Sequence, residues 1–354
     1  MRIHPTLKRS RNCVVALSGL CVHVLSCPAA SAEPRAFQGP ADLRNQRPYQ
    51  LLFLAFSPER TEALGPGHSA LSAQLDIGNN LLVSTRNNVS VREDTETERL
   101  ALKYRWGLGH GFEAAVAAPL MWRNAGFTDK IIENYHHLIN VTGSNPDIDG
   151  GRREVSAYHS MLSVTDSQGH RLVDAGPAAG IGDLQITLKR DLVKLPWHAL
   201  SARVGVKLPT GTAGNLIGSG GTDFGVDLTG SVALTDRLCL YGDISEVAAQ
   251  RDSHVALKTN QRIRRGILAL EYYTNSRTSW IVQNEIADAA LRTGNPFVDG
   301  NQGTFALAVK YKPNARTTWT YGFTENGGLF AYQANWAADI APDPTFTIGW
   351  ETTR

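Results

Sequence analysis

Charged residues stand at every second position in several segments of this chain, with apolar residues between them. Lys103 and Arg105 alternate with Leu102, Tyr104 and Trp106 in this way. Because the side chains of a β-strand alternate between its two faces, these charges share one face and the apolar residues share the other. The charged residues that we expect on the polar faces of strands are Lys103, Arg105, Glu113, Asp183, Lys189, Arg203, Lys207, Asp227, Asp243, Glu271, Glu285 and Lys310.

Two kinds of chemistry fit charges that are gathered on one face. Rings of charged side chains set the selectivity of a pore. Charges of opposite sign also pair across neighbouring strands and fill an interior without any conduction. The mixed signs favour pairing for most of these residues. The candidates for lining a lumen are Lys103, Arg105, Arg203, Lys207, Asp227, Asp243, Glu271 and Glu285.

A second group of polar residues lies in the segment 128–139, which has the pattern of a short amphipathic helix with Thr128 as its N-cap. Its candidate site residues are Asp129, Glu133, His136 and His137. Their spacings of three and four residues place side chains on neighbouring positions of one helix face, and carboxylates and imidazoles are zinc ligands. Since the sequence offers no second cluster of ligands, a solvated polar face is the favoured interpretation. We predict neither a metal site nor a cofactor.

Enzymatic chemistry would need a nucleophile beside a base. His68-Ser69 and His159-Ser160 are adjacent pairs, but neighbours along a strand point to opposite faces and cannot share a proton. The sequence therefore predicts no catalytic residues and no enzyme.

The elements that carry these residues follow from a regular alternation between about residues 69 and 350. In the segment 303–311, for example, Phe305, Leu307 and Val309 share one face, opposite Thr304 and Lys310. A strand in hydrocarbon must pair its backbone groups with neighbouring strands, so a set of half-apolar strands in a membrane requires a closed cylinder. The sequence predicts an all-β fold, a transmembrane antiparallel β-barrel.

The predicted strands cover roughly 50–57, 69–77, 81–91, 98–107, 112–120, 183–190, 198–208, 224–234, 236–246, 266–274, 278–287, 304–311, 317–324 and 344–350. This gives about 14 strands. The segment 50–57 is apolar on both faces, so it fits a plug or an N-terminal segment equally well. Twelve strands are the alternative.

The connections between these strands fall into two classes. Short turns are predicted at 77–80, 107–111, 234–236, 274–277 and 312–316, and long loops at 121–182, 209–223, 247–265, 288–303 and 325–343. In membrane barrels the short turns face the periplasm and the long loops face outside. The insert 121–182 is long enough for structure of its own, so we expect a partly helical extracellular insert that enters or caps the barrel mouth.

The N-terminus has the pattern of an export signal. Basic residues precede an apolar run at 13–22, and Ala30-Ser31-Ala32 has the small-x-small form of a cleavage site. We predict a signal peptide over 1–32, a periplasmic or plug segment over 33–49 and a barrel over 50–354. The expected location is the outer membrane of a Gram-negative envelope.

Composition excludes several other classes of protein. The chain has 35 basic and 33 acidic residues, and this balance gives no indication of nucleic-acid binding. Three of its four cysteines lie in the predicted signal peptide, so Cys239 remains alone and the mature chain has no pair for a disulfide. We interpret Cys239 as a small buried residue.

With these features together, the chain resembles an outer-membrane family known as domain of unknown function 3187. The resemblance covers most of the mature chain and rests on the motifs Leu43-Arg44-Asn45-Gln46-Arg47-Pro48-Tyr49, Asp94-Thr95-Glu96-Thr97, Leu100 to Gly107, the helix from Asp129 to His136, Gly180-Ile181-Gly182-Asp183-Leu184 and Lys207-Leu208-Pro209-Thr210-Gly211. It implies a barrel fold and an outer-membrane location, but no substrate. Such barrels commonly end on an aromatic residue, whereas Trp350 is followed by four further residues in this chain.

The sequence favours a passive channel or small-solute transporter of the outer membrane. The alternatives are a non-conducting structural or assembly-partner barrel and, less favoured, a lipid-modifying enzyme. The expected partners are outer-membrane lipid and lipopolysaccharide, the barrel assembly machinery and an unknown small solute, and no nucleic acid. Because Lys207 and Asp227 lie on consecutive strands around the loop 209–223, we expect antiparallel pairing to bring their inward side chains alongside each other as a pair, although the register cannot be read from the sequence.

Overall fold

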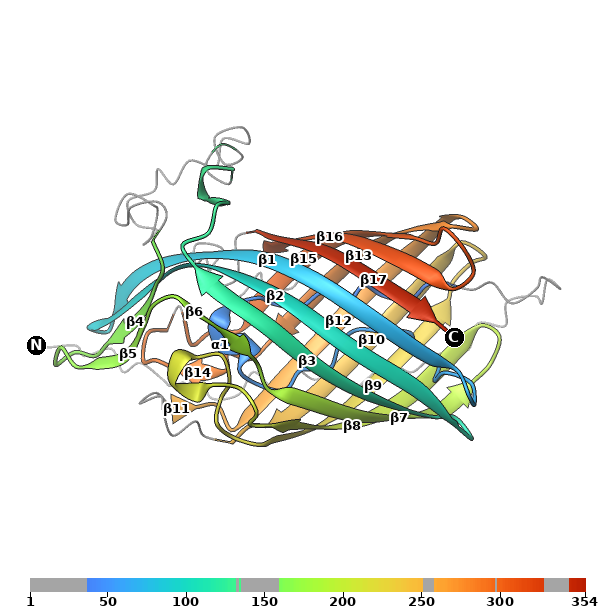
Figure 1. The fold of residues 1–354 in the computed structure, drawn as a ribbon, viewed down its shortest axis with the longest axis horizontal. Coiled ribbons are helices and arrows are strands. Elements are labelled where there is room, and N and C mark those ends of the chain that lie inside the picture. Colours follow the sequence, from blue (N-terminus) through green and yellow to red (C-terminus); the bar gives the residue numbers. More distant parts are fainter. Residues whose placement is uncertain (1–36, 132–133, 135–158, 251–257, 297, 328–343) are drawn as a thin grey trace, which may run out of the picture. The chain divides into compact units, whose positions relative to one another are not determined.

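An antiparallel sheet that closes on itself dominates the computed structural model of the chain (Figure 1). The structure describes residues 37–131, 134, 159–250, 258–296, 298–327 and 344–354. Within these ranges, twelve strands form a ring in which each pairs with the next, and β1 closes it by pairing with β17. The closing strands run antiparallel, with Ala70 opposite Thr353 and Gly78 opposite Thr345.

The strands of the ring are β1 (Ser69–Arg86), β2 (Val89–Gly109), β3 (Phe112–Asn124), β7 (Leu184–Lys194), β8 (His198–Leu208), β9 (Asp223–Ala233), β10 (Leu238–Ala248), β12 (Arg262–Asn275), β13 (Thr278–Ala287), β15 (Gln302–Tyr311), β16 (Thr317–Asn326) and β17 (Thr345–Thr353). Shorter strands extend this sheet: β4 (Met161–Thr165) pairs with β2, β5 (Arg171–Ala175) with β4, and β6 (Ala178–Ile181) with β3. The remaining elements are the small ladder of β11 (Lys258–Thr259) and β14 (Leu291–Arg292), the helix α1 (Pro48–Leu51) and the 3₁₀ turn η1 (Ala213–Asn215).

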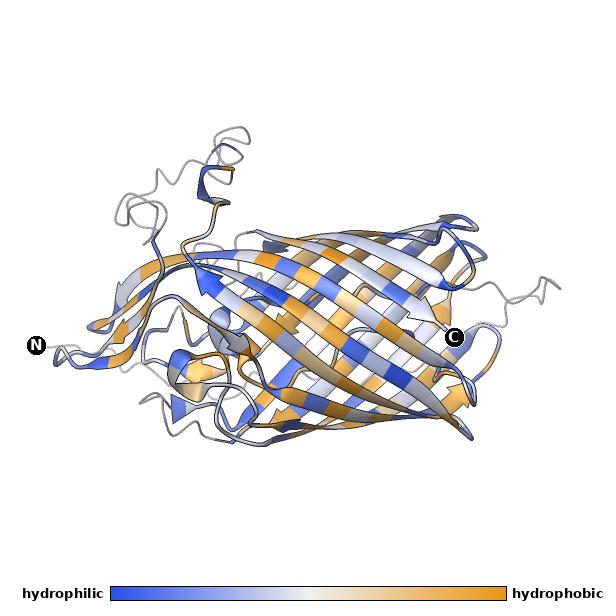
Figure 2. Cartoon of the chain, viewed as in Figure 1, coloured by the Kyte–Doolittle hydropathy of each residue, from blue (hydrophilic) through white to orange (hydrophobic). Residues whose placement is uncertain are grey.

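The alternation of side chains along the strands matches a barrel with an apolar outer face. Hydrophobic and hydrophilic residues alternate along the ring strands in Figure 2. Val226 is 58% exposed on the outer face, whereas its neighbour Asp227 is 5% exposed and points inward. The predicted fold class, a transmembrane antiparallel β-barrel, is therefore confirmed.

Twelve is the correct strand count, and the count of fourteen is wrong for two reasons. The first reason is that residues 50–57 form no strand; the chain passes from α1 into irregular backbone there. Phe53 and Phe56 are each 1% exposed, because this segment lies inside the barrel and is packed from all sides. A segment that is buried all round has no reason to alternate polar and apolar residues.

The second reason is that the turn predicted at 77–80 does not exist. Gly78, Asn79 and Asn80 continue the ladder of β1, opposite Thr97, Glu96 and Thr95 of β2. The chain turns instead at Asn87 and Asn88, whose φ angles of 51° and 59° are those of a two-residue hairpin turn. Both Asn-containing sites are turn signals, and the contact of the Asn79 amide with Thr128 and Asp129 keeps the first of them in the strand.

The long hairpin of β1 and β2 continues past the barrel on the side of the long loops. There it packs with β4 and β5, and its tip contacts the loop between β13 and β15. The amide of Asn295 in that loop donates hydrogen bonds to the Ser84 hydroxyl at 3.0 Å and to the Val89 carbonyl at 3.3 Å. The hairpin is therefore joined to a loop that lies several strands away around the ring.

The described part of the insert 121–182 consists of β4, β5, β6, the end of β3 and one helical turn at 129–131. No helix in the described residues is long and apolar enough to cross a membrane.

Candidate functional site: the occupied lumen

The interior of the barrel contains part of the chain itself. We call residues 37–64 the lumen segment. It begins beside the short turn of β12 and β13, where Gln38 contacts the Arg277 carbonyl, and rises to α1, where Gln50 contacts the Asp288 carbonyl near the long loops. It then returns, and Gly67 donates to the Gly107 carbonyl beside the short turn of β2 and β3. The lumen segment thus has a rising arm (37–47), an apolar bend that includes α1 (48–56) and a descending arm (57–64).

Inward side chains of the ring strands bind the backbone of the lumen segment. Wall carboxylates accept hydrogen bonds from backbone N–H groups: Glu271 from Gln38 at 2.8 Å and Gly39 at 3.1 Å, Asp223 from Leu54 at 2.9 Å, Asp191 from Ala63 at 2.7 Å and Glu113 from Leu64 at 2.9 Å. Wall donors bind its carbonyls: Lys310 binds those of Gln38 and Pro40, Arg203 that of Ser57, Arg265 that of Phe56, Lys189 that of Arg60 and Ser201 that of Thr61. Irregular backbone inside a barrel needs such partners, because buried backbone groups without hydrogen bonds are costly.

The most concentrated charges surround Glu59 of the descending arm. Its carboxylate lies 2.7 Å from Lys189 Nζ, 3.4 Å from Arg203 Nη1 and 3.5 Å from Lys103 Nζ. Lys103 also contacts Asp42 of the rising arm at 3.0 Å. Both arms of the lumen segment are therefore held by ion pairs to the same side of the wall.

Arg203 joins two of the predicted lumen residues to this cluster. Its Nε donates to Asp227 and its Nη2 donates to Asp243, each at 2.6 Å. Asp227 lies opposite Arg203 on β9, and Asp243 comes from β10. All three side chains are almost fully buried, so the two carboxylates satisfy the guanidinium on the wall side while Ser57 and Glu59 contact it from the lumen segment.

Lys207 has different partners from the one expected. The register of β8 and β9 places Lys207 opposite Asp223 and Arg203 opposite Asp227, so the expected pairing of Lys207 with Asp227 is wrong by four residues. Its Nζ lies 2.6 Å from Asp183 Oδ2 and 3.5 Å from Asp223 Oδ2, and it donates to the Gly221 carbonyl at 2.9 Å. Asp183 also accepts hydrogen bonds from the backbone of Gly211 and Ser219, so this cluster fastens the loop between β8 and β9 to the wall.

The remaining predicted lumen residues also lie inside the wall. Arg105 pairs with Glu351 at 2.8 Å and lies 3.6 Å from Glu113. Arg265 pairs with Glu285 at 2.7 Å. Glu271 accepts a hydrogen bond from the Tyr241 hydroxyl at 2.7 Å in addition to those from the lumen segment. The eight candidates do not form one ring; they form several clusters that bind each other and the lumen segment.

Near the mouth, the contacts of the lumen segment become largely apolar. Leu52, Phe53, Leu54 and Phe56 belong to one buried cluster with residues of the β1–β2 hairpin, β4, β5, β10 and β14, among them Leu82, Val91, Leu162, Val164, Val247 and Leu291. One ion pair crosses this region: Arg47 donates to Glu93 of β2 at 2.9 Å and 2.6 Å, and both side chains are 2% exposed. The bend of the lumen segment is therefore packed against the cap formed by the hairpins and loops.

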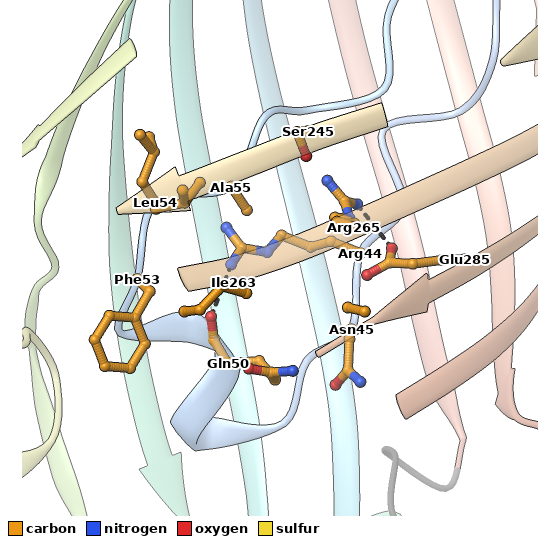
Figure 3. Close-up of a pocket in the computed structure, with 12 residues that line it drawn as sticks. Arg44, Asn45, Gln50, Phe53, Leu54, Ala55, Ser245, Ile263, Arg265 and Glu285 are labelled. Atoms are coloured by element: carbon orange, nitrogen blue, oxygen red, sulfur yellow. Dashed lines mark hydrogen bonds and ion pairs between the residues drawn. The ribbon is translucent and has the colours of Figure 1, made fainter. Parts of the chain in front are cut away.

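A cavity of about 30 Å³ lies beside the bend, lined by Arg44, Gln50 and Phe53 on one side and by Ser245, Arg265 and Glu285 of the wall on the other (Figure 3). The space between segment and wall at this level is large enough to hold water.

The wall is shaped to accept the lumen segment. Gly205 of β8 and Gly225 of β9 lie directly opposite each other and leave space for the Phe56 ring. A Cβ atom at Gly205 would lie 2.9 Å from this ring, and one at Gly225 would lie 2.8 Å from it. Gly322 makes similar space for Leu43, where a Cβ would come within 2.8 Å. Atoms this close must move, so these glycines fit the wall to its own N-terminal segment.

The predicted site in the insert is only partly described. Asp129 is buried and accepts a hydrogen bond from the Asn79 amide at 2.8 Å, so it faces β1 instead of solvent. Glu133, His136 and His137 lie outside the described residues. Within the described ranges, no group of three or more potential ligands could hold a metal ion.

The sequence interpretation missed the residues of the lumen segment that contact the wall charges, above all Asp42, Arg47 and Glu59. Their signal was indirect: charged residues flank a segment, 50–57, that is apolar on both faces and does not alternate. A segment of this kind next to a set of inward charges is better explained by burial inside the barrel than by a strand.

The fold resembles that of a solved outer-membrane channel. The COG4313 outer membrane channel from Pseudomonas putida F1 has a TM-score of 0.55 and 11% sequence identity, covering 85% of this chain and 100% of that one. The NanC porin has a TM-score of 0.44 and 8% identity, covering 80% of this chain and 98% of that one. At sequence identities this low, the similarity to these structures concerns the fold alone.

The chain belongs to the family described as Protein of unknown function (DUF3187), whose profile matches residues 17–350. The resemblance inferred from the sequence motifs is thus confirmed. A comparison with curated proteins found no match.

The glycine pair generates the first prediction. A valine at Gly225 places its Cβ against Phe56, so Gly225→Val should destabilise the folded barrel by about 1–3 kcal/mol. The measurement is the temperature at which the folded, heat-modifiable band disappears on a gel. The matched control is Gly242→Val on β10, where an added Cβ meets nothing within 4 Å. An equal effect of the two variants would contradict docking of Phe56 on β8 and β9. Phe56→Ala should relieve part of the effect of Gly225→Val, because Leu54 and Val247 also lie 3.0 Å from the added Cβ.

The Lys207 cluster generates the second prediction. Lys207→Met leaves Asp183 and Asp223 buried without their cation, which should cost about 3–5 kcal/mol and lower the same transition temperature. Asp183→Asn in the same molecule should recover part of that loss. Lys194→Met is the control, because its side chain is 60% exposed and its ion pair with Asp191 spans 3.9 Å, so an effect below about 1 kcal/mol is expected. Equal effects at Lys207 and Lys194 would contradict the cluster.

Proposed function

We propose that this protein is a passive channel of the outer membrane for small solutes, closed by its own lumen segment. The observation that carries this proposal is the occupied lumen. Eight strands already give a barrel whose interior side chains can fill. A ring of twelve strands encloses more space than that, and in this chain residues 37–64 occupy it.

The contacts of the two arms support a plug that can move. They consist mainly of hydrogen bonds and ion pairs between wall side chains and the segment. A hydrogen bond to a charged group contributes about 1.5–3 kcal/mol net, because water replaces the lost partner when the contact opens. The arms can therefore exchange the wall for water one contact at a time, whereas the apolar bend stays bound to the cap.

The proposed orientation follows the connections. The short turns, such as 234–237 and 312–316, face the periplasm, and the long loops face outside. The outer face then contacts lipid and lipopolysaccharide, and the barrel assembly machinery inserts the strands. The signal peptide 1–32 exports the chain. The activity that we propose is transport, and it needs no catalytic group.

One observation favours a second candidate, a non-conducting structural barrel. The apolar cluster joins the bend of the lumen segment to both hairpins and to the loop of β14, which resembles a folded core more than a movable contact. Such a barrel would keep its lumen closed under all conditions.

Conductance distinguishes the two candidates. The full-length protein in planar bilayers should show rare, small openings, and a variant without residues 37–64 should show frequent openings of much larger conductance. A variant that lacks residues 167–169, in the exposed turn between β4 and β5, is the control and should behave as the full-length protein. If the folded deletion variant is silent in the bilayer, the channel proposal is wrong and the structural barrel is the better account.

A further inference from the structure

Three cations of the wall converge on one carboxylate of the lumen segment. Lys103 from β2, Lys189 from β7 and Arg203 from β8 all reach the carboxylate of Glu59, at 3.5, 2.7 and 3.4 Å. The side chains of Lys189 and Arg203 are 2% and 3% exposed, so they are fixed in place around this position. Donors from three strands that converge on two oxygen atoms have the geometry of a carboxylate-binding site.

The three wall cations differ in the carboxylates with which they still pair if Glu59 moves away. Lys189 keeps Glu113, and Arg203 keeps Asp227 and Asp243. Both ion pairs that the structure gives Lys103 are with Asp42 and Glu59, which belong to the lumen segment. Movement of the segment therefore leaves an ammonium without its two carboxylates, beside two further donors that already point at the vacated position.

We propose that Lys103, Lys189 and Arg203 form a binding site for the carboxylate group of a small solute, and that Glu59 occupies this site in the closed state. This inference rests on the proposed channel function and gives it a substrate class. A solute carboxylate competes with Glu59 for the three donors, so its binding favours the state in which the lumen segment has moved. Because Glu113, Asp227 and Asp243 lie close by, the site has little excess positive charge and suits a monoanion better than a dianionic phosphate.

Chemical rescue in the full-length chain tests the site without any need for conduction. Glu59→Ala removes the carboxylate and leaves space for a small anion beside the three donors. The variant should lose its folded, heat-modifiable band at a lower temperature than the wild type. Sodium acetate should restore roughly half or more of that loss relative to sodium chloride at the same ionic strength, because a ligand that binds the folded state stabilises it.

Two controls make the rescue specific. Glu62→Ala removes a carboxylate of the same arm whose ion pair, with Arg60, spans 3.9 Å, so acetate should not affect it. Acetamide has the shape of acetate without its charge and should not rescue Glu59→Ala, and inorganic phosphate should rescue it less than acetate does. Equal responses to acetate and chloride would overturn the carboxylate site.

Bilayer recordings test the competition and remain informative if Glu59→Ala does not fold. Glu59→Gln keeps the side-chain shape and removes the charge, so it should raise the open probability by about tenfold, which corresponds to about 1.4 kcal/mol, whereas Glu62→Gln should not. Acetate should raise the open probability of the wild type but not that of Glu59→Gln. Equal behaviour of the two Gln variants, or a wild type that ignores acetate in a bilayer where the deletion variant conducts, would contradict the competition. Silence of the deletion variant would contradict only the channel.

Discussion

The hydrogen-bonding requirement of a backbone enclosed in a barrel is the constraint on which the rest of this structure depends. The lumen segment has almost no regular structure of its own, so its N–H and C=O groups must find partners elsewhere. A buried backbone group without a partner costs about 1–3 kcal/mol. Wall residues such as Glu271, Asp191 and Lys310 supply those partners. The inward direction of the polar side chains thus serves two purposes. It keeps charge away from lipid, and it provides the groups that bind the chain's own N-terminal segment.

Shape and charge act together in this arrangement. Gly205 and Gly225 remove side chains from the wall at the position where Phe56 enters it. A few residues further along the chain, Glu59 meets three wall cations. The Phe56 ring packs on the wall glycines and under the Arg203 guanidinium, and this contact gains by excluding water. The charged contact of Glu59 can be replaced by water or by another anion. The lumen segment therefore combines an anchored bend with arms whose contacts are exchangeable, and this combination is what a gate requires.

The two-residue alternation in the sequence predicted the strands and the faces of their side chains. The prediction failed where tertiary contacts override local signals. The alternation in segments such as 303–311 was sufficient for the barrel, because the inward or outward direction of a strand residue follows from its parity. The register of neighbouring strands could not be predicted. Lys207 lies opposite Asp223 instead of Asp227, because the conformation of the loop between β8 and β9 sets the register, and the length of the loop alone does not reveal it. The turn at Asn87 and Asn88 was missed for a related reason, since Gly78-Asn79-Asn80 offers an equally good local signal and only the contacts of Asn79 keep it extended.

Hydrogen exchange along the lumen segment tests the central claim most directly, because the claim concerns its backbone. In the full-length protein in detergent or lipid, the amides of Leu54, Ala63 and Leu64 donate to buried wall carboxylates. The account predicts that peptides covering 38–46 and 53–64 exchange nearly as slowly as the strand β8 and far more slowly than the exposed turn 312–316. Exchange of both arms at the rate of that turn would contradict the claim that residues 37–64 fill the lumen.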